Sequence, residues 1–265
     1  MKKWIAMLLA LTMVFGFAAC GGNDAADDNA DKALVYAVEA GSAGEAAALE
    51  NGWEINSVVD QATALMEVES GTSDAAIIDL LMAGAMIGEG TSYPNLTYTD
   101  KLTTEEYGVG CRKGSDLVDV INAVFSAAYA DGSMKEIATE YGVQESLCEQ
   151  PAGLTWEAAA DGDVAAIQKA GKLVVGITEF APMDYKEAGS DEWIGFDADM
   201  ARLVAEELGV EIEFVVIDWD MKINEVNAKN IDCVWNGMTL TNEVTSAMDC
   251  SAAYCNNAQV VVVAK

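Results

Sequence analysis

The sequence predicts an α/β protein of two lobes, each a mostly parallel β-sheet flanked by helices. Short apolar segments alternate with segments of helical period, which is typical of parallel sheets covered by helices. The alternation occurs in two runs, separated by a linker around residues 145–170 that contains Pro151 and several Gly and Ala residues. The length of 265 residues, of which 52% are hydrophobic, is enough for two domains with apolar cores.

The first run begins with a strand candidate at 34–38, an apolar segment that leads into the turn Gly41–Gly44. A helix rich in Ala, Glu and Leu follows, and Gly52 is placed to end it. The rest of the run is assigned in the same way, with a strand-like segment at 57–60, a helix at 62–68, a buried strand at 75–78, a helix after Asp79, and extended segments at 95–98 and 107–111.

Two helices are predicted in the middle of the chain. Residues 117–125 carry apolar side chains at helical spacing, and Asp116 is the candidate N-cap. Ser133 and Glu136 have the spacing of a capping box, which opens a second short helix. Gly142 is placed to end that helix.

The second run repeats the alternation of strands and helices. Its best-defined helix is 199–208, which keeps four apolar residues on one face and is followed by Gly209 as a stop signal. The other elements are strands at 173–177 and 212–217, a helix at 221–228, and strands at 231–235 and 259–263. Strands of this length between helices indicate a second parallel sheet with helices on its faces.

The charge of the chain excludes several functions. The sequence has 14 Lys and Arg against 44 Asp and Glu, a net charge of −30, so its surface repels nucleic acid and anionic lipid head groups. It contains no histidine. Ser-His-Asp and Cys-His nucleophile systems and histidine-based zinc motifs are therefore impossible. We expect no metal and no cofactor.

The N-terminus has the pattern of an export signal. Lys2 and Lys3 precede residues 4–19, a weakly polar to apolar run shorter than the ~20 residues that span a bilayer. The run ends in Phe17-Ala-Ala before Cys20, which resembles the lipobox of bacterial lipoproteins, although Leu is usual where Phe17 stands. The sequence thus predicts a signal peptide over 1–20, a lipid on Cys20, and a flexible acidic tether over 21–31. An ordinary signal peptide with an incidental Cys is the alternative.

The remaining cysteines do not form a recognisable motif. There is no CxxC pair, which leaves a redox motif or zinc ribbon without support. Their number is odd, so at least one thiol is unpaired even where an oxidising compartment permits disulfides. The five are Cys111, Cys148, Cys233, Cys250 and Cys255.

Both runs resemble a known protein family, but in swapped order. The second run is similar to the N-terminal half of the polar amino-acid-binding proteins of ABC importers, extracytoplasmic solute-binding proteins of family 3, and the first run to their second half. The matching stretches are 172–183, 195–199, 231–243 and 258–263 in the second run, and 38–45, 71–79 and 106–114 in the first. The resemblance implies a periplasmic-binding-protein type II fold in a circularly permuted chain. Two fragments fused by a gene-model error are the alternative.

A permuted chain leads to specific expectations about the lobes. Residues 32–109 should form the lobe that is the family's second half, and 110–265 the other, with the linker inside it. One covalent crossing near 107–111 should connect the lobes. The terminal strand 259–265 should lie beside this crossing as a hinge strand. A strand 259–263 remote from the crossing would refute the permutation.

The resemblance also implies which residues hold a ligand. The turn Gly41-Ser42-Ala43 lies between a strand and a helix, where backbone N–H groups and the helix dipole favour an anion, and it matches the family's contact with the ligand α-carboxylate. Asp79 matches the residue that pairs with the α-ammonium, although a helix N-cap is the alternative. Phe180 matches the aromatic residue that covers the ligand, with core packing as the alternative. The strand-end segment is Asn236, Gly237, Met238 and Thr239.

One position departs from the family pattern. Val244 stands where relatives commonly have an Arg that binds the ligand carboxylate, and the only arginines are Arg112 and Arg202. Lys222 aligns with a pocket position and is the candidate for the missing positive charge, with a solvated helix lysine as the alternative. We expect Lys222 to face Asp79 across the cleft, with Ser42 and Thr239 beside them.

These features predict a receptor rather than an enzyme. The expected protein is an extracytoplasmic, lipid-anchored monomer that binds an amino acid or a related small amine and delivers it to the permease of an ABC importer. Two other classes stay open: a dehydratase-like enzyme on the same fold, and a sensory receptor that reports the ligand to a membrane partner.

Overall fold

The computed structural model describes residues 33–265. The predicted signal peptide, Cys20 and the tether lie outside the described residues. Within the described part, no helix is both long enough and apolar enough to cross a membrane.

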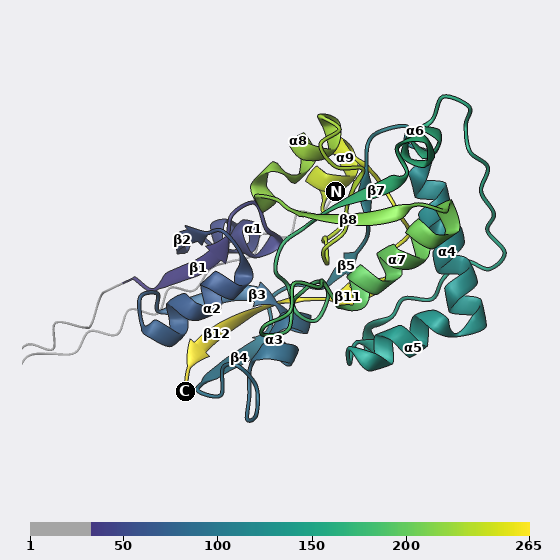
Figure 1. Ribbon diagram of the computed structural model, residues 1–265. Coiled ribbons are helices and arrows are strands. Elements are labelled where there is room, and N and C mark those ends of the chain that lie inside the picture. The colour runs from purple at the N-terminus through teal and green to yellow at the C-terminus, as the bar shows by residue number, and fades with distance from the viewer. Residues whose placement is uncertain (1–32) are drawn as a thin grey trace, which may run out of the picture. The chain divides into compact units, whose positions relative to one another are not determined.

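The first sheet has the strand order β2-β1-β3-β12-β4. Its strands are β1 (Val35–Glu39), β2 (Glu54–Val58), β3 (Ala75–Asp79), β4 (Leu96–Lys101) and β12 (Gln259–Ala264). The first three are parallel, whereas β12 is antiparallel to both β3 and β4. Helices α1 (Ala43–Glu50) and α2 (Gln61–Ser70) pack on β1 and β3, and α3 (Leu80–Met86) follows β3 directly (Figure 1). All five residues of β3 are buried, which explains its apolar sequence.

The second sheet repeats this arrangement, with the order β10-β6-β9-β7-β8. Its strands are β6 (Gly110–Cys111), β7 (Lys172–Ile177), β8 (Glu211–Val216), β9 (Cys233–Val234) and β10 (Asp249–Cys250). Again three strands are parallel, and one antiparallel strand, β6, comes from a distant part of the chain. Two sheets of the same topology confirm the predicted two-lobed α/β architecture.

The helices of the second lobe cover its sheet and bury the apolar faces that the sequence predicted. They are α4 (Leu117–Asp131), α5 (Ser133–Glu140), α6 (Asp163–Ala170), α7 (Phe196–Leu208), α8 (Lys222–Asn227) and α9 (Asn242–Ala247). On α4 the predicted stripe is buried from Leu117 to Phe125 except for Val124, which is half-buried. Helix α7 begins three residues earlier than predicted and ends at Gly209, whose φ is +70°.

The helices begin where they were predicted, after Asp116 and at Ser133, but the predicted side-chain caps are wrong. The Asp116 carboxylate accepts hydrogen bonds from the backbone N–H groups of Ala159 and Val164, both at 3.0 Å, and makes none to α4. It therefore caps α6, a helix in the segment interpreted as linker. Gly132 is the N-cap of α5, and the Ser133 hydroxyl donates to the Asp131 carboxylate and to the Ala128 carbonyl of α4.

Two strands connect the lobes, and they lie side by side. Strand β5 (Glu105–Tyr107) pairs antiparallel with β11 (Cys255–Asn257), with Tyr107 opposite Cys255. The chain crosses once through β5 and returns through β11, so the prediction of a single covalent crossing is wrong. The final strand β12 is not a hinge strand of the second lobe, because it pairs between β3 and β4 inside the first sheet. Residues 259–264 therefore belong to the first lobe.

The position of β12 bears on the predicted permutation. Because β12 is antiparallel to β3, its end lies at the same sheet edge as the start of β1. Only β3 separates these strands, which places them about 10 Å apart at ordinary strand spacing. The N–H of Leu102, next to the crossing, donates to the Gln259 carbonyl at 2.8 Å, so β12 is not remote from it. The refuting arrangement is absent from the described residues, and the permutation stays a prediction.

Aromatic side chains anchor the crossing strands in the second lobe. Tyr107 and Tyr254 are fully buried, with ring centroids 6.2 Å apart. Phe125 of α4 packs on Tyr254 at 5.6 Å and on Trp235 at 5.5 Å. Such pairs bury large apolar areas in defined orientations. They hold the Tyr107 hydroxyl in place for the site described below.

Candidate functional site

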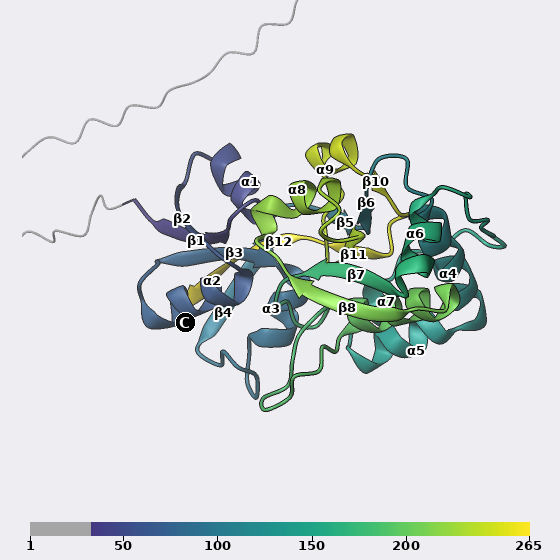
Figure 2. The ribbon, with the colours of Figure 1, turned by 45° about the horizontal axis from the view of Figure 1, so that its top comes forward.

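A cavity of about 420 Å³ lies between the two lobes at the carboxyl ends of the parallel strands. This is where open α/β sheets place ligands. In Figures 1 and 2, α1 of the first lobe lies beside α8 of the second. The cavity brings together every residue that the sequence singled out for the ligand: Gly41, Ser42, Ala43, Asp79, Phe180, Lys222, Asn236, Gly237, Met238 and Thr239.

Asp79 is held in the cavity wall by hydrogen bonds from several side chains. Its carboxylate is buried and accepts hydrogen bonds from the Tyr107 hydroxyl at 2.6 Å, from Gln259 Nε2 at 3.1 Å, and from the side-chain amides of Asn257 and Gln61. The backbone N–H of Asp79 in turn donates to Gln61 Oε1 at 2.9 Å. Both crossing strands thus contribute to one carboxylate.

Asp79 occupies the N-cap position of α3, but its side chain does not cap the helix, because its carboxylate makes no hydrogen bond to that helix. The free N–H groups there are satisfied by the returning chain, Leu80 by the Ala258 carbonyl at 2.8 Å and Leu81 by Asn257 Oδ1 at 3.3 Å. Burial, followed by the negative charge of Glu105, raises the pKa of Asp79 to about 7, against the lowering effect of its hydrogen bonds.

Glu39 is a second acid in the cavity, and the sequence analysis missed it. It ends β1 as Asp79 ends the neighbouring β3, and its side chain is only 3% exposed. Its Oε1 has no hydrogen-bond partner among the described residues. Burial, and then the charges of Asp79 and Asp60, raise the pKa of Glu39 to about 8. The available signal was the shared edge of parallel strands, where residues that end adjacent strands meet.

The turn Gly41–Ala43 is less free than the sequence predicted. The Gly41 N–H donates to the Glu45 carboxylate at 2.8 Å. The Ser42 hydroxyl accepts from the Glu45 N–H at 3.0 Å as the N-cap of α1. An acidic side chain of the same helix therefore occupies part of the anion site, and the expectation that the Gly41 N–H is free is wrong.

Lys222 is buried rather than solvated, with 7% of the residue exposed. Its Nζ donates to the Gly41 carbonyl at 2.8 Å and to the Trp219 carbonyl at 3.1 Å, and lies 4.9 Å from the centre of the Trp219 ring. It thus bridges the lobes. Burial lowers the pKa of Lys222, and Glu39 opposes this. Lys222 and Asp79 line one cavity, but each is held by other partners.

Asn236, which follows β9, is hydrogen-bonded to Thr178, which follows β7. Its Oδ1 accepts from the N–H and the hydroxyl of Thr178, at 3.0 and 2.6 Å, and its Nδ2 donates to the Thr178 carbonyl at 3.0 Å and to Asp184 at 2.8 Å. The Thr239 hydroxyl donates to Glu105 at 3.1 Å. These polar groups shape the cavity wall while their hydrogen bonds are made within the protein.

Phe180 is both a residue of the cavity wall and a packed residue of the core. It lines the cavity and is also packed, 3% exposed, with its ring centroid 6.3 Å from that of Tyr107. A Cβ on Gly237 would lie 2.3 Å from Phe180 Cε1, and Gly237 has a φ of +56°. Glycine at this position therefore allows the aromatic ring to form the cavity wall.

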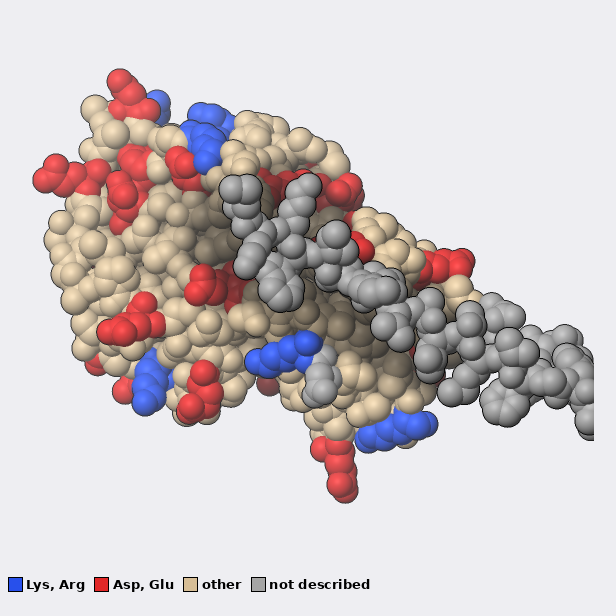
Figure 3. Space-filling view, turned by 180° about the vertical axis from the view of Figure 1, so that it is seen from behind, with Lys and Arg blue, Asp and Glu red and all other residues tan. Residues whose placement is uncertain are grey.

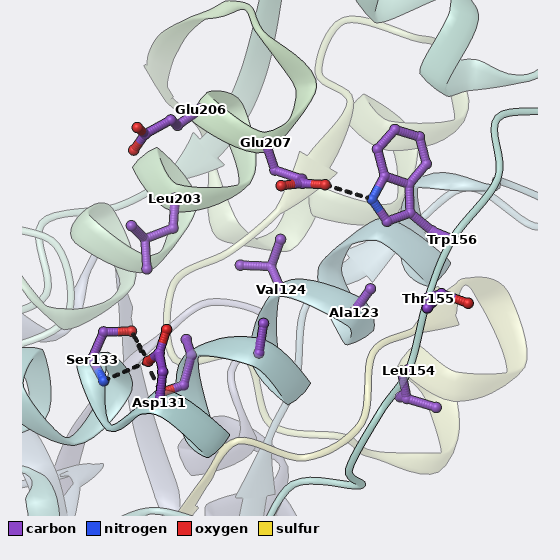
Figure 4. Close-up of a pocket in the computed structure, with 12 residues that line it drawn as sticks. Ala123, Val124, Asp131, Ser133, Leu154, Thr155, Trp156, Leu203, Glu206 and Glu207 are labelled. Carbon is purple, nitrogen blue, oxygen red and sulfur yellow. Dashed lines mark hydrogen bonds between the residues drawn. The ribbon is translucent and has the colours of Figure 1, made fainter.

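A larger cavity, about 610 Å³, lies elsewhere (Figure 4). Helices α4 and α7 and residues 154–156 line it, and Trp156 Nε1 donates to Glu207 at 3.0 Å. Its acidic side chains, Asp131, Glu206 and Glu207, are exposed, and none of the predicted ligand residues lines it. It lacks the converging buried polar groups of the cavity between the lobes.

The outer surface is acidic. Figure 3 shows Asp and Glu side chains spread over one face, with Lys and Arg at a few separate positions. This distribution agrees with the net charge of −30 and leaves the face without a continuous basic patch.

Comparisons with known proteins agree with the resemblance. Residues 173–265 match the model of the family "Bacterial extracellular solute-binding proteins, family 3". The arginine-binding extracellular protein ArtP of Bacillus subtilis is 34% identical over 92 residues, covering 34% of this chain and 35% of that protein. The L-cystine-binding protein TcyA of the same organism is 34% identical over 110 residues, 40% of each chain. The matches thus span well under half the length of these relatives.

Among solved structures, an ancestral cationic amino acid solute-binding protein is 36% identical and covers 32% of this chain and 37% of its own, with a TM-score of 0.31. The family match and the two sheets of equal topology confirm the predicted periplasmic-binding-protein type II fold. Residues 173–265 thus match the family that the resemblance named.

Proposed function

We propose that this protein binds an amino acid or a related small amine between its lobes. It then delivers the ligand to an ABC importer without changing it chemically. Residues 173–265 match family 3 of the bacterial extracellular solute-binding proteins. The observation that carries the proposal is the buried Asp79, which both crossing strands hold at the edge of a cavity between the lobes. A buried carboxylate in such a place binds an ammonium group once water is expelled. The arginine-binding and cystine-binding relatives support the substrate class.

Contacts between the lobes support a mechanism of closure. The Lys222 ammonium on α8 donates to the Gly41 carbonyl of the other lobe, and a Cβ on Gly41 would lie 2.7 Å from Asp220 Cα. The lobes therefore touch at the rim of the cavity. Because the paired strands β5 and β11 form the two connections, a small bend there opens the cleft. Closing around a ligand presents both lobes together to a permease.

A ligand screen tests this function directly. At a concentration 100 times its dissociation constant, a true ligand stabilises the folded state by about 2.7 kcal/mol. We expect a rise in melting temperature of about 5–10 °C by differential scanning fluorimetry. The screen should contain the amino acids and small aliphatic amines. If no member of either group raises the melting temperature, the proposed function is wrong.

Gly41→Ala is expected to weaken ligand binding at least about tenfold by blocking closure. The added Cβ would meet Asp220 Cα at 2.7 Å, which is backbone and cannot move aside cheaply. Gly52→Ala is the matched control, because Gly52 has the same φ of +70° but nothing within 4 Å of a Cβ. Both variants should lose about 1 kcal/mol of stability from the strained backbone. Equal affinities for the two variants by calorimetry would contradict closure at Gly41.

We also propose that a lipid on Cys20 anchors the mature protein outside the cytoplasm. The support is the sequence alone: the apolar run 4–19, the small residues before Cys20, and the acidic tether after it. Wild-type protein should fractionate with membranes, whereas Cys20→Ser protein should not. Equal membrane association of both proteins in cells would rule out this anchor.

A further inference from the structure

We propose that the preferred ligand is a small aliphatic diamine, with an ammonium group at each end and no carboxylate. The proposal rests on the proposed function, since it takes the cavity between the lobes as the ligand site. It is carried by two sets of observations. Acidic side chains line both the floor and the rim of the cavity, and the turn that could hold a ligand carboxylate already holds the Glu45 carboxylate.

The acids that line the cavity outnumber its bases. Glu39 and Asp79 form the buried floor, at the ends of two adjacent strands. Glu50 at the end of α1 and Glu243 at the start of α9 line the same cavity and are exposed, so they form its rim. Lys222 is the only basic residue among those that line it. A cavity with acids at two levels suits a ligand that is positive at both ends.

Glu39 supplies one acceptor atom, Oε1, without a donor among the described residues, although a hydrogen bond from Gln61 acts on the same carboxyl group and lowers its pKa. Its Oε1 has no hydrogen-bond partner within the described part of the chain, although the side chain is 3% exposed. Buried polar atoms without a partner are rare, because leaving water without a replacement hydrogen bond is unfavourable. An ammonium with three donors would satisfy this oxygen and one oxygen of Asp79 together.

The turn that could hold a ligand carboxylate is already occupied by an acidic side chain of the protein. The Glu45 carboxylate accepts from the Gly41 N–H at 2.8 Å, and the Glu45 N–H donates to the Ser42 hydroxyl oxygen at 3.0 Å. A ligand carboxylate would have to lie beside the Glu45 carboxylate at this turn, where like charges repel.

The arginines are engaged elsewhere, and Lys222 is partly engaged. The Lys222 ammonium donates to the carbonyls of Gly41 and Trp219, which uses two of its three N–H groups. Arg112 forms an ion pair with Asp163 at 2.8 Å, and Arg202 pairs with Asp199 at 2.7 Å. Neither arginine lines the cavity. A carboxylate in the closed cleft would therefore find no free guanidinium.

The protonation of Glu39 provides a second test of the same site, because it makes ligand affinity depend on pH. Asp60, Asp79 and Lys222 are the charged groups that act on it, and burial with the two acids raises the pKa of Glu39 to about 8. In the empty cleft the carboxyl is therefore largely protonated at pH 7. An ammonium beside Oε1 favours the carboxylate, so the proton leaves to solvent when the ligand binds. Affinity should increase as the pH rises from 6 to 8.

The decisive experiment compares two ligands that differ only by a carboxylate, 1,4-diaminobutane and ornithine. By titration calorimetry on the intact chain we expect the diamine to bind at least about tenfold more tightly. Equal or tighter binding of ornithine would overturn the proposal while leaving the proposed function intact. If neither compound nor any amino acid binds, it is the proposed function that fails.

Two substitutions, at Glu39 and at Glu45, test which residues produce the preference for the diamine. Glu39→Gln should weaken diamine binding about 30-fold and reduce the proton release to the part that comes from Asp79, measured as the change in binding enthalpy between buffers of different ionisation enthalpy. Glu54→Gln is the control, because it makes the same change at an exposed residue of β2 outside the cavity. Glu45→Ala should free the Gly41 N–H and reduce the preference for the diamine over ornithine. The same affinity and proton release in the Glu39 and Glu54 variants would refute the role of Glu39.

Discussion

Asp79→Asn is expected to weaken ligand binding by about 3 kcal/mol, roughly 150-fold, whatever amine the cleft accepts. The substitution keeps the size of the side chain but removes a carboxylate to which both crossing strands donate hydrogen bonds. The hydrogen bonds that converge on Oδ1, from Tyr107, Asn257 and Gln259, can survive on the Asn oxygen. Only Gln61, which donates to Oδ2, would then face a second donor.

The two effects of Asp79 can therefore be separated. Asp79→Asn should cost about 1–2 kcal/mol of stability, because one buried donor loses its acceptor. Asp79→Ala leaves all of these donors without an acceptor and should cost about 3–5 kcal/mol. Urea unfolding and calorimetry measure the two quantities on the same protein. Asp191→Asn, at an exposed position, is the control and should change neither. Unimpaired binding by Asp79→Asn would exclude Asp79 as the ammonium site.

The unliganded protein should be less stable at pH 8 than at pH 5, with a melting temperature at least about 5 °C lower. The cause is a set of buried carboxyl groups in the folded state. Burial is the largest cause in each case, and it raises the pKa of Glu39 to about 8 and those of Asp79 and Asp197 to about 7. It also raises the pKa of Asp184, together with the charge of Asp197.

The sign follows from proton linkage. The unfolded carboxyl groups titrate near pH 4, whereas the folded ones hold their protons up to pH 7 or 8. Between these values the folded state binds more protons than the unfolded state, so raising the pH lowers the free energy of unfolding. Each such group removes about 3 kcal/mol between pH 5 and pH 8. Repulsion among surface acids acts in the same direction, but 0.5 M salt screens it and leaves the buried groups unaffected.

Asp184 provides the sharpest test of this explanation. Its Oδ1 and the Oδ1 of Asp197 are both buried without a hydrogen-bond partner among the described residues. Asp184→Asn keeps an acceptor for Asn236 and removes one of two coupled charges. We expect it to stabilise the protein by about 1–3 kcal/mol at pH 8, with little change at pH 5. Asp191→Asn is again the exposed control. A loss of stability at pH 8 would show that Asp184 does not carry the pH effect.

The sequence alone predicts the two α/β lobes, because alternating apolar and helical segments mark their strands and helices. The ligand residues follow from the resemblance to family 3, which implies that strand-end positions such as Asp79 and Asn236 face one ligand, and all of them line one cavity. Glu39 lines the same cavity without being part of the resemblance, because it ends β1 beside Asp79 at the end of β3.

Tertiary structure decided the rest, because the rest depends on partners far away in the chain. Strand β12 could pair with either lobe by its own pattern, and only its contacts with β3 and β4 place it in the first sheet. Asp116 has the spacing of a cap for α4 but meets Val164 of α6. Whether a polar side chain is free depends on what else reaches it. The engaged N–H of Gly41 and the Glu39 oxygen without a partner among the described residues, on which the proposed preference for a diamine rests, therefore emerge only when the chain is folded.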